Sequence, residues 1–160
     1  MFRVRASYKN GLEIEAPLAR VREFFRDLKN FTELLSGIES IRREAGGIAR
    51  WTISADTPIG HVRFSFPVQQ TIYRADLIEW SPAANESGNL LRYSVGFTER
   101  DTHTSVSISQ QVELRRARAR DLHPALAIIG EAPVNAGLQR RINEAIDAFL
   151  ARAKAKLEAA

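Results

Sequence analysis

The sequence predicts an α+β domain in which a curved antiparallel sheet of six to seven strands wraps around one long C-terminal helix. Two observations support this prediction. Between residues 38 and 114, six segments alternate apolar and polar side chains and are joined by short turns, which force neighbouring strands to pair antiparallel. Residues 133–157 then carry an apolar stripe at helical spacing, long enough to cover such a sheet. The 160 residues suit a single domain, residues 1–160.

The first strand is predicted over residues 2–16, where apolar side chains alternate with polar ones. Asn10 and Gly11 interrupt this alternation and are compatible with a hairpin turn or with a bulge in one long strand. The apolar positions keep the same parity on both sides of the pair, which favours the bulge.

Two short helices are predicted after this strand. Pro17 opens the first, at a position where its missing N–H does no harm, and an apolar stripe continues to Leu28. Asn30 and Glu33 approximate a capping box for the second helix, and Gly37 is predicted to end it.

The turns between the later strands are predicted at Gly46-Gly47, at residues 56–60 and at residues 98–103. These turns separate six strands, which are predicted at residues 38–44, 48–55, 61–74, 76–80, 91–97 and 105–114.

Pro67 falls inside the third of these six strands. Because proline cannot donate a ladder hydrogen bond, it predicts an edge position or a bulge there. A register shift at this point would turn Gln70 outward and Gln69 inward. Residues 121–132 are apolar and are predicted to begin the C-terminal helix or to form a short turn packed against it.

The composition excludes several kinds of chemistry. The chain has no cysteine, which excludes disulfides, thiolate metal sites and a cysteine nucleophile. The three histidines lie far apart, so no metal site is expected, and His61 and His123 are predicted at surface or capping positions. No phosphate-binding loop or dinucleotide fingerprint is present, and no cofactor is expected.

Charge and hydropathy set the expected surroundings of the protein. No run of about 18 apolar residues occurs, so no transmembrane segment is predicted. The charged N-terminal segment lacks the apolar stretch of a secretory peptide, which predicts a cytoplasmic protein. The net charge is +4, and the basic run RRARAR at residues 115–120 has no aromatic stacking surface beside it. Nucleic acid is therefore not an expected partner, whereas peripheral contact with a membrane or an enzyme through this run stays open.

Strand parity predicts which side chains face the C-terminal helix. Such a wall is compatible with a packed core or with a ligand cavity, and ligand cavities are mostly apolar with a few placed polar groups. Three polar side chains share the apolar parity, provided that no bulge turns Gln70 outward: Gln70, Tyr93 and Gln110. The residues predicted to bind a ligand are Trp51, Phe64, Phe66, Gln70, Tyr93, Val95, Phe97, Gln110, Leu138 and Ile142.

Local sequences add a resemblance to a known superfamily. The stretch LEIEAPLARVREFFRDLKNFTELLSGIESI at 12–41 has a strand that ends at Ala-Pro, then two helices and a Gly-led strand. RADLIEW at 74–80 and GNLLRYSV at 88–95 supply central strands, and APVNAGLQRRINEAIDAFLARAKAKLE at 132–158 supplies the long helix. Over essentially its whole length, the chain resembles the START-like (SRPBCC) helix-grip superfamily, which includes polyketide cyclase/dehydrase-like and hydrophobic-ligand-binding proteins. The resemblance implies a helix-grip fold with a cavity between sheet and long helix.

Three function classes remain open. The first is binding or transport of a hydrophobic small molecule, such as a lipid, a polyketide or an isoprenoid. The second is a cofactor-free cyclase or dehydratase that moves protons with Tyr93, His103 or Arg74. The third is an accessory protein that docks on a membrane or an enzyme. Tyr93 is the single titratable residue placed firmly on the inward face, which favours binding over catalysis. The oligomeric state and the ligand are left open.

Overall fold

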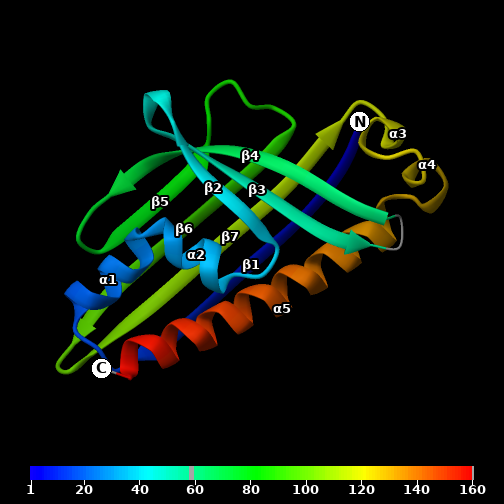
Figure 1. Ribbon diagram of the computed structural model, residues 1–160. Coiled ribbons are helices and arrows are strands. Elements are labelled where there is room, and N and C mark those ends of the chain that lie inside the picture. The colour runs from blue at the N-terminus through cyan, green and yellow to red at the C-terminus, as the bar shows by residue number, and fades with distance from the viewer. Residues whose placement is uncertain (58–59, 160) are drawn as a thin grey trace.

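The structure, a computed structural model, describes residues 1–57 and 60–159. Within these residues, seven strands form one curved antiparallel sheet in the order β1-β7-β6-β5-β4-β3-β2, with β1 and β2 at its edges (Figure 1). This confirms the predicted sheet. The strands are β1 (Phe2–Ile14), β2 (Ile38–Glu44), β3 (Ile48–Thr57), β4 (Gly60–Tyr73), β5 (Leu77–Pro82), β6 (Asn89–Arg100) and β7 (His103–Arg116).

The helices lie on one face of this sheet, and the longest runs beside β1 (Figure 1). It begins two residues before the predicted start and confirms the predicted long C-terminal helix. The helical segments are α1 (Leu18–Arg26), α2 (Leu28–Leu34), the 3-10 turn η1 (Ala45–Gly47), α3 (Ala119–Leu122), α4 (Leu126–Ile129) and α5 (Glu131–Glu158).

The first strand is continuous, so the bulge predicted at Asn10-Gly11 is wrong. β1 pairs with β7 without a shift over its whole length, and Gly11 lies directly opposite Ser107. An unbroken strand also keeps the same parity on both sides of the pair, which is the pattern that suggested a bulge. A Cβ atom at Gly11 would lie 3.4 Å from the carbonyl oxygen of Val106, so glycine suits the close approach of β7.

The second helix begins earlier than predicted. Asp27 is its N-cap, because the Asp27 side chain accepts a hydrogen bond from the backbone N–H of Lys29 at 3.0 Å. Asn30 instead lies inside α2 and donates to the carbonyl oxygen of Phe24 at 2.8 Å. The helix also ends at Leu34, before the predicted Gly37, which leads into β2 at a φ of 92°.

Pro67 causes no register shift. Its pairing with Arg50 lies in an unbroken β3–β4 ladder. The strand tolerates the missing N–H because Pro67 lies one residue beyond the end of the β4–β5 pairing, which begins at Val68. A bulge does occur in β4, but between Gln70 and Ile72.

The turns differ in detail from the prediction. The turn after β6 contains Asp101 and Thr102 alone, with Asp101 at a φ of 46°, so both flanking strands are longer than predicted. The glycine turn at 46–47 is confirmed as η1, where both glycines have positive φ. The loop predicted at 56–60 falls in part on residues 58–59, which lie outside the described residues. Residues 121–132 form α4 and parts of α3 and α5.

Polar side chains of α5 cover the open edge of β1. Every fourth residue of α5 can meet every second residue of β1, because four residues of helix rise about 6.0 Å and two residues of strand about 6.6 Å. The side chains therefore occupy an edge that would otherwise be free to pair with another chain. We call this set the edge ladder: the backbone N–H groups of Arg3, Arg5 and Ser7 donate to the side chains of Glu131, Asn135 and Gln139 at 3.0, 2.7 and 3.0 Å.

Candidate functional site

Aromatic side chains fill the space between the sheet and the C-terminal half of α5. Phe149 of α5 stacks on Phe31 of α2, with ring centroids 5.0 Å apart. Trp51 of β3 and Tyr93 of β6 lie 5.4 and 5.5 Å from the same Phe31 ring. We call these four residues the aromatic cluster. All the fully buried residues of α5 lie at this end, from Ile146 to Leu157.

The N-terminal half of α5 instead borders a cavity of about 410 Å³ between the helix and the sheet. Leu138 and Ile142 reach it from α5, and Phe64 and Phe66 reach it from β4. Gly137 also faces it, and a Cβ atom built at Gly137 would meet no atom within 4 Å. Space therefore remains between helix and sheet at this end, because no aromatic side chain projects from this half of the helix.

A few polar groups interrupt the apolar lining of the cavity. Gln110 of β7 lies opposite Tyr8 on one neighbouring strand and Tyr93 on the other. The Tyr8 hydroxyl donates to Asp147 at 2.5 Å, whereas the Gln110 amide has no side-chain hydrogen bond within the described residues. His123 and Arg141 lie along the wall, and Arg141 donates to the backbone oxygen of Asp56. The Gln110 amide can thus bond a polar group of a ligand.

Half of the predicted ligand-binding residues border this cavity. The structure brings together Phe64, Phe66, Gln110, Leu138 and Ile142.

Four other predicted residues lie on the predicted face but are packed in the core. Strand parity placed them correctly, yet neighbours from α1 and α2 fill the space in front of them; for example, the ring of Phe25 lies 6.0 Å from that of Phe97. These four, each at most 5% exposed, are Trp51, Tyr93, Val95 and Phe97.

Gln70 is exposed and lies outside the cavity lining. It pairs with the buried Trp80 and so shares the face of the sheet that α5 covers. This position is beyond the end of β3, whose pairing with β4 stops at Gln69, and the side chain therefore reaches solvent. Gln69 lies on the opposite face.

Two buried polar atoms lie inside the aromatic cluster. Among the described residues, neither Trp51 Nε1 nor the Tyr93 hydroxyl has a hydrogen-bond partner. Burial raises the pKa of Tyr93 well above its usual range, with Arg43 opposing the shift. Tyr93 therefore stays protonated at neutral pH and cannot act there as a general base.

Sequence reasoning missed the contribution of the segment before α5. Leu126 and Ile129 of α4 line the cavity, and Leu126 is 1% exposed. His123, which was predicted at a surface or capping position, also lines it. The backbone N–H of Ala125 donates to His123 Nδ1 at 3.1 Å, so a neutral His123 carries its proton on Nε2. The apolar composition of 121–132 was the available signal.

Two further candidates for proton transfer lie away from the cavity. His103 pairs with Glu13 at 3.1 Å, and Arg74 pairs with Asp76 at 3.5 Å. Neither residue lines the cavity. In the described part of the chain, no three acidic or histidine side chains are grouped in a way that would hold a metal ion. No helix among residues 1–57 and 60–159 is long and apolar enough to cross a membrane.

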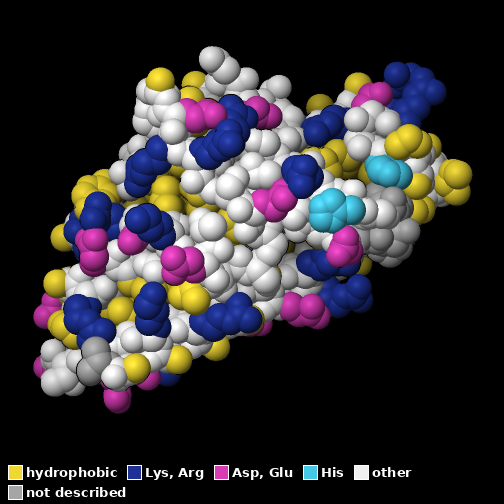
Figure 2. Space-filling model, viewed as in Figure 1, with side chains coloured by type: hydrophobic (Ala, Val, Ile, Leu, Met, Phe, Trp, Pro, Cys, Tyr) yellow, Lys and Arg dark blue, Asp and Glu magenta, His cyan; other side chains and the backbone are white. Residues whose placement is uncertain are grey.

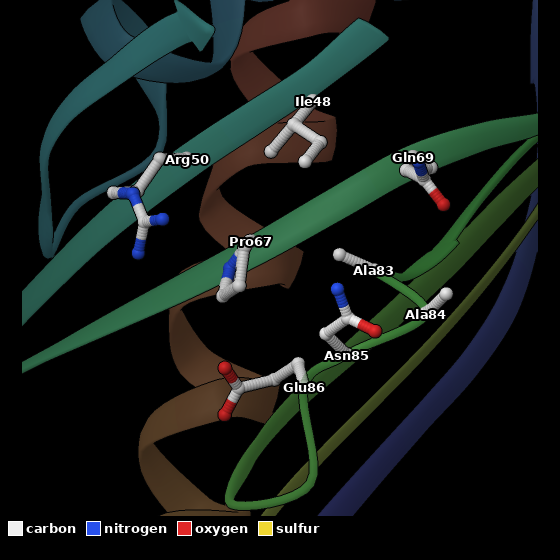
Figure 3. A pocket seen from close by; sticks show the side chains of 8 residues that line it. All are labelled: Ile48, Arg50, Pro67, Gln69, Ala83, Ala84, Asn85 and Glu86. Carbon is white, nitrogen blue, oxygen red and sulfur yellow. The ribbon is translucent and has the colours of Figure 1, made fainter. Parts of the chain in front are cut away.

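A second pocket, of about 230 Å³, lies on the opposite face of the sheet (Figure 3). Its charged groups are used within the protein. Arg50 bonds Glu44 at 2.9 Å, and Glu86 accepts the backbone N–H groups of Gly88 and Asn89. The pocket is lined by Ile48 and Arg50 of β3, Pro67 and Gln69 of β4, and residues 83–86.

Comparison with solved structures identifies the fold. A START superfamily protein from Mycobacterium smegmatis aligns with a TM-score of 0.61 and 11% identity, over 95% of this chain and 97% of that one. The Zhui aromatase/cyclase from Streptomyces sp. R1128 aligns with a TM-score of 0.58 and 12% identity, over 95% of each chain. The di-domain aromatase/cyclase BexL aligns at 0.63 and 17% identity, over 97% of this chain and 50% of that one.

No family model and no curated protein sequence matches the chain. The structural likeness nevertheless confirms the START-like helix-grip fold that the local sequences indicated.

Proposed function

We propose that the protein binds a hydrophobic small molecule in the cavity between the sheet and the N-terminal half of α5. One observation carries the proposal: a cavity of about 410 Å³ with a mainly apolar lining. Small-molecule sites usually have about 300–1,000 Å³, an apolar wall and a few polar groups that orient the ligand. A lipid, a polyketide or an isoprenoid has the matching chemistry.

The state of the lining residues supports this proposal. Phe64, Leu138 and Ile142 are only partly buried, whereas the inward-facing side chains of the aromatic cluster are fully buried. Burial of apolar surface stabilises by about 25 cal/mol per Å², so this uncovered surface is a source of binding free energy. The Gln110 amide supplies a polar contact on the sheet side of the cavity.

Cavity filling tests the proposal. A neutral apolar probe, N-phenyl-1-naphthylamine, should bind with one-to-one stoichiometry and raise the melting temperature, since a ligand of the folded state stabilises it by mass action. Gly137→Phe should reduce probe affinity at least tenfold, because Gly137 borders the cavity and a side chain added there meets no atom within 4 Å of its Cβ position. Fluorescence titration and thermal unfolding measure both effects.

Gly137→Ala is the matched control. It leaves the cavity open and should stabilise the helix by about 1 kcal/mol, because alanine has the higher helix propensity. Equal probe binding by the parent and by a folded Gly137→Phe variant would contradict the proposed site.

A second candidate function is cofactor-free cyclisation or dehydration of a bound polyketide. The observation that favours it is His123, an imidazole that lines the cavity and whose side chain can give or take a proton. Aromatase/cyclases are among the proteins of similar fold. His123→Ala should abolish turnover of a poly-β-ketone substrate and leave probe binding intact. Unchanged turnover would remove His123 from this role.

A further inference from the structure

Exposed apolar side chains gather at one end of the molecule. Ile128 is 91% exposed and Ile129 is 41% exposed, and both lie on α4. Figure 2 shows hydrophobic side chains there, over the end of the molecule that α3 and α4 form. Across the described residues, the other large exposed apolar side chains are Met1 and Tyr73.

Met1 belongs to the same end of the molecule. It is 80% exposed and precedes Phe2, which pairs with Arg116 shortly before α3. Tyr73 lies elsewhere, with the Arg22 guanidinium 4.5 Å from its ring centroid. Met1 and residues 117–130 together form what we call the α3–α4 tip.

Cations flank these apolar side chains on the α3–α4 tip. Arg118 and Arg120 are exposed, and Asp121, 3.5 Å from Arg118, is the one acidic residue within 117–130. In Figure 2, dark-blue basic side chains lie beside the yellow ones at this end. Such a combination of protruding apolar groups and basic side chains is complementary to the interface of an anionic bilayer.

The basic run at 115–120 is divided by the fold. Arg115 lies 2.7 Å from Glu113, and Arg116 donates to the oxygens of Gly88 and Asn89. The Arg115 side chain is thus paired within β7, and the Arg116 side chain joins β7 to the start of β6. Arg118 and Arg120 are the two exposed cations of this run. Arg118 keeps a longer contact to Asp121 at 3.5 Å, and Arg120 has no ion pair within the described residues, so both can reach lipid phosphates.

The packing of α4 does not explain the exposure of Ile128. Leu126 anchors α4 by entering the cavity wall and is 1% exposed, whereas Ile128 contacts mainly solvent. We propose that the α3–α4 tip docks on an anionic membrane surface, with Ile128 and Met1 inserted among the lipids and Arg118 and Arg120 at the phosphates. Because Ile129 also lines the cavity, docking places a cavity wall at the bilayer.

Vesicle co-sedimentation of the full chain tests this docking. The protein should bind vesicles that contain phosphatidylserine, bind phosphatidylcholine vesicles much more weakly, and dissociate as salt rises from about 0.1 to 0.5 M. Ile128→Ser should weaken binding at least tenfold, since it removes one inserted apolar side chain. The double variant Arg118→Ser/Arg120→Ser should weaken it about 30-fold, through the loss of two lipid-facing charges.

Matched controls make the same kinds of substitution at exposed positions away from the α3–α4 tip. Arg42→Ser/Arg43→Ser removes two exposed charges from β2, and Tyr73→Ser removes an exposed apolar side chain; both should bind like the parent. All variants should bind the apolar probe normally in the absence of vesicles, which separates this test from that of the cavity. Absent binding, equal binding to both lipids, or binding that the tip variants leave unchanged would overturn the proposal. A concentration-dependent dimer that Ile128→Ser abolishes, with no vesicle binding, would also overturn it and assign the tip to contact between copies.

Discussion

Tyr93 combines complete burial with a hydroxyl that has no partner among the described residues. An unsatisfied buried hydroxyl costs about 1–3 kcal/mol. Tyr93→Phe keeps the ring in the aromatic cluster and removes this cost, so the variant should be more stable at pH 7 by about 1 kcal/mol. Urea unfolding measures the difference, and a clear loss of stability would show that the hydroxyl is engaged.

The same residue sets an alkaline limit to stability. Because burial raises the pKa of Tyr93 above its unfolded value of about 10, the native state keeps this proton at pH values where the unfolded state loses it. The contribution of Tyr93 to stability should therefore be constant below pH 10 and fall above it, by up to about 1.4 kcal/mol per pH unit. Burial and Asp147 also raise the pKa of Tyr8, which adds to the loss.

Tyr93→Phe should make this alkaline loss less steep, and urea unfolding at pH 9 to 11 measures the slopes. Equal slopes for parent and variant would contradict the assigned role of Tyr93.

Residue parity predicted the inward face of each strand but not the space in front of it. Phe64 and Val95 both lie on the face that α5 covers, yet one lines the cavity and the other is completely buried. The difference comes from the side chains of α1 and α2, whose rings cover β6: Phe25 lies 6.0 Å from Phe97, and Phe31 lies 5.5 Å from Tyr93. Sequence spacing contains no information about such contacts between distant segments.

At the scale of elements, α5 has three functions along its length. Its C-terminal half packs against the aromatic cluster, its N-terminal half borders the cavity, and its polar flank forms the edge ladder with β1. The apolar stripe of the sequence predicted the packed half and the cavity half of α5 as one continuous face. The edge ladder was not predicted, because it depends on the alignment of α5 with β1, which the sequence pattern does not define.

The edge ladder should contribute measurably to stability. Asn135→Ala/Gln139→Ala removes the acceptors of the Arg5 and Ser7 N–H groups and should cost about 2 kcal/mol, at about 1 kcal/mol for each hydrogen bond. It should also promote aggregation by freeing the edge of β1. Chemical denaturation and light scattering measure these effects.

Arg140→Ala is the control for this pair, since Arg140 is an exposed neighbour on the same helix without a bond to β1. If the double variant were as stable and as monodisperse as this control, the edge ladder would have no stabilising role.

At the scale of the molecule, the order of elements predicted the fold because short turns restrict how consecutive strands pair. The strands from β2 to β7 are hydrogen-bonded in sequence order, as those turns require. The predictions that failed were local: the bulge at Asn10-Gly11, the cap at Asn30 and the helix end at Gly37. Each depends on a few local hydrogen bonds, and the same stretch of sequence allows more than one arrangement of these bonds.

The central claim is that the sheet and α5 enclose a ligand site, and crystallography with a heavy-atom ligand tests it most directly. Crystals of the protein saturated with iodobenzene should show anomalous iodine density between Phe64, Gln110 and Leu138. Density at this position, absent from Gly137→Phe crystals, is the predicted result. A parent structure in which side chains fill this space, with no iodine between sheet and helix, would contradict the account.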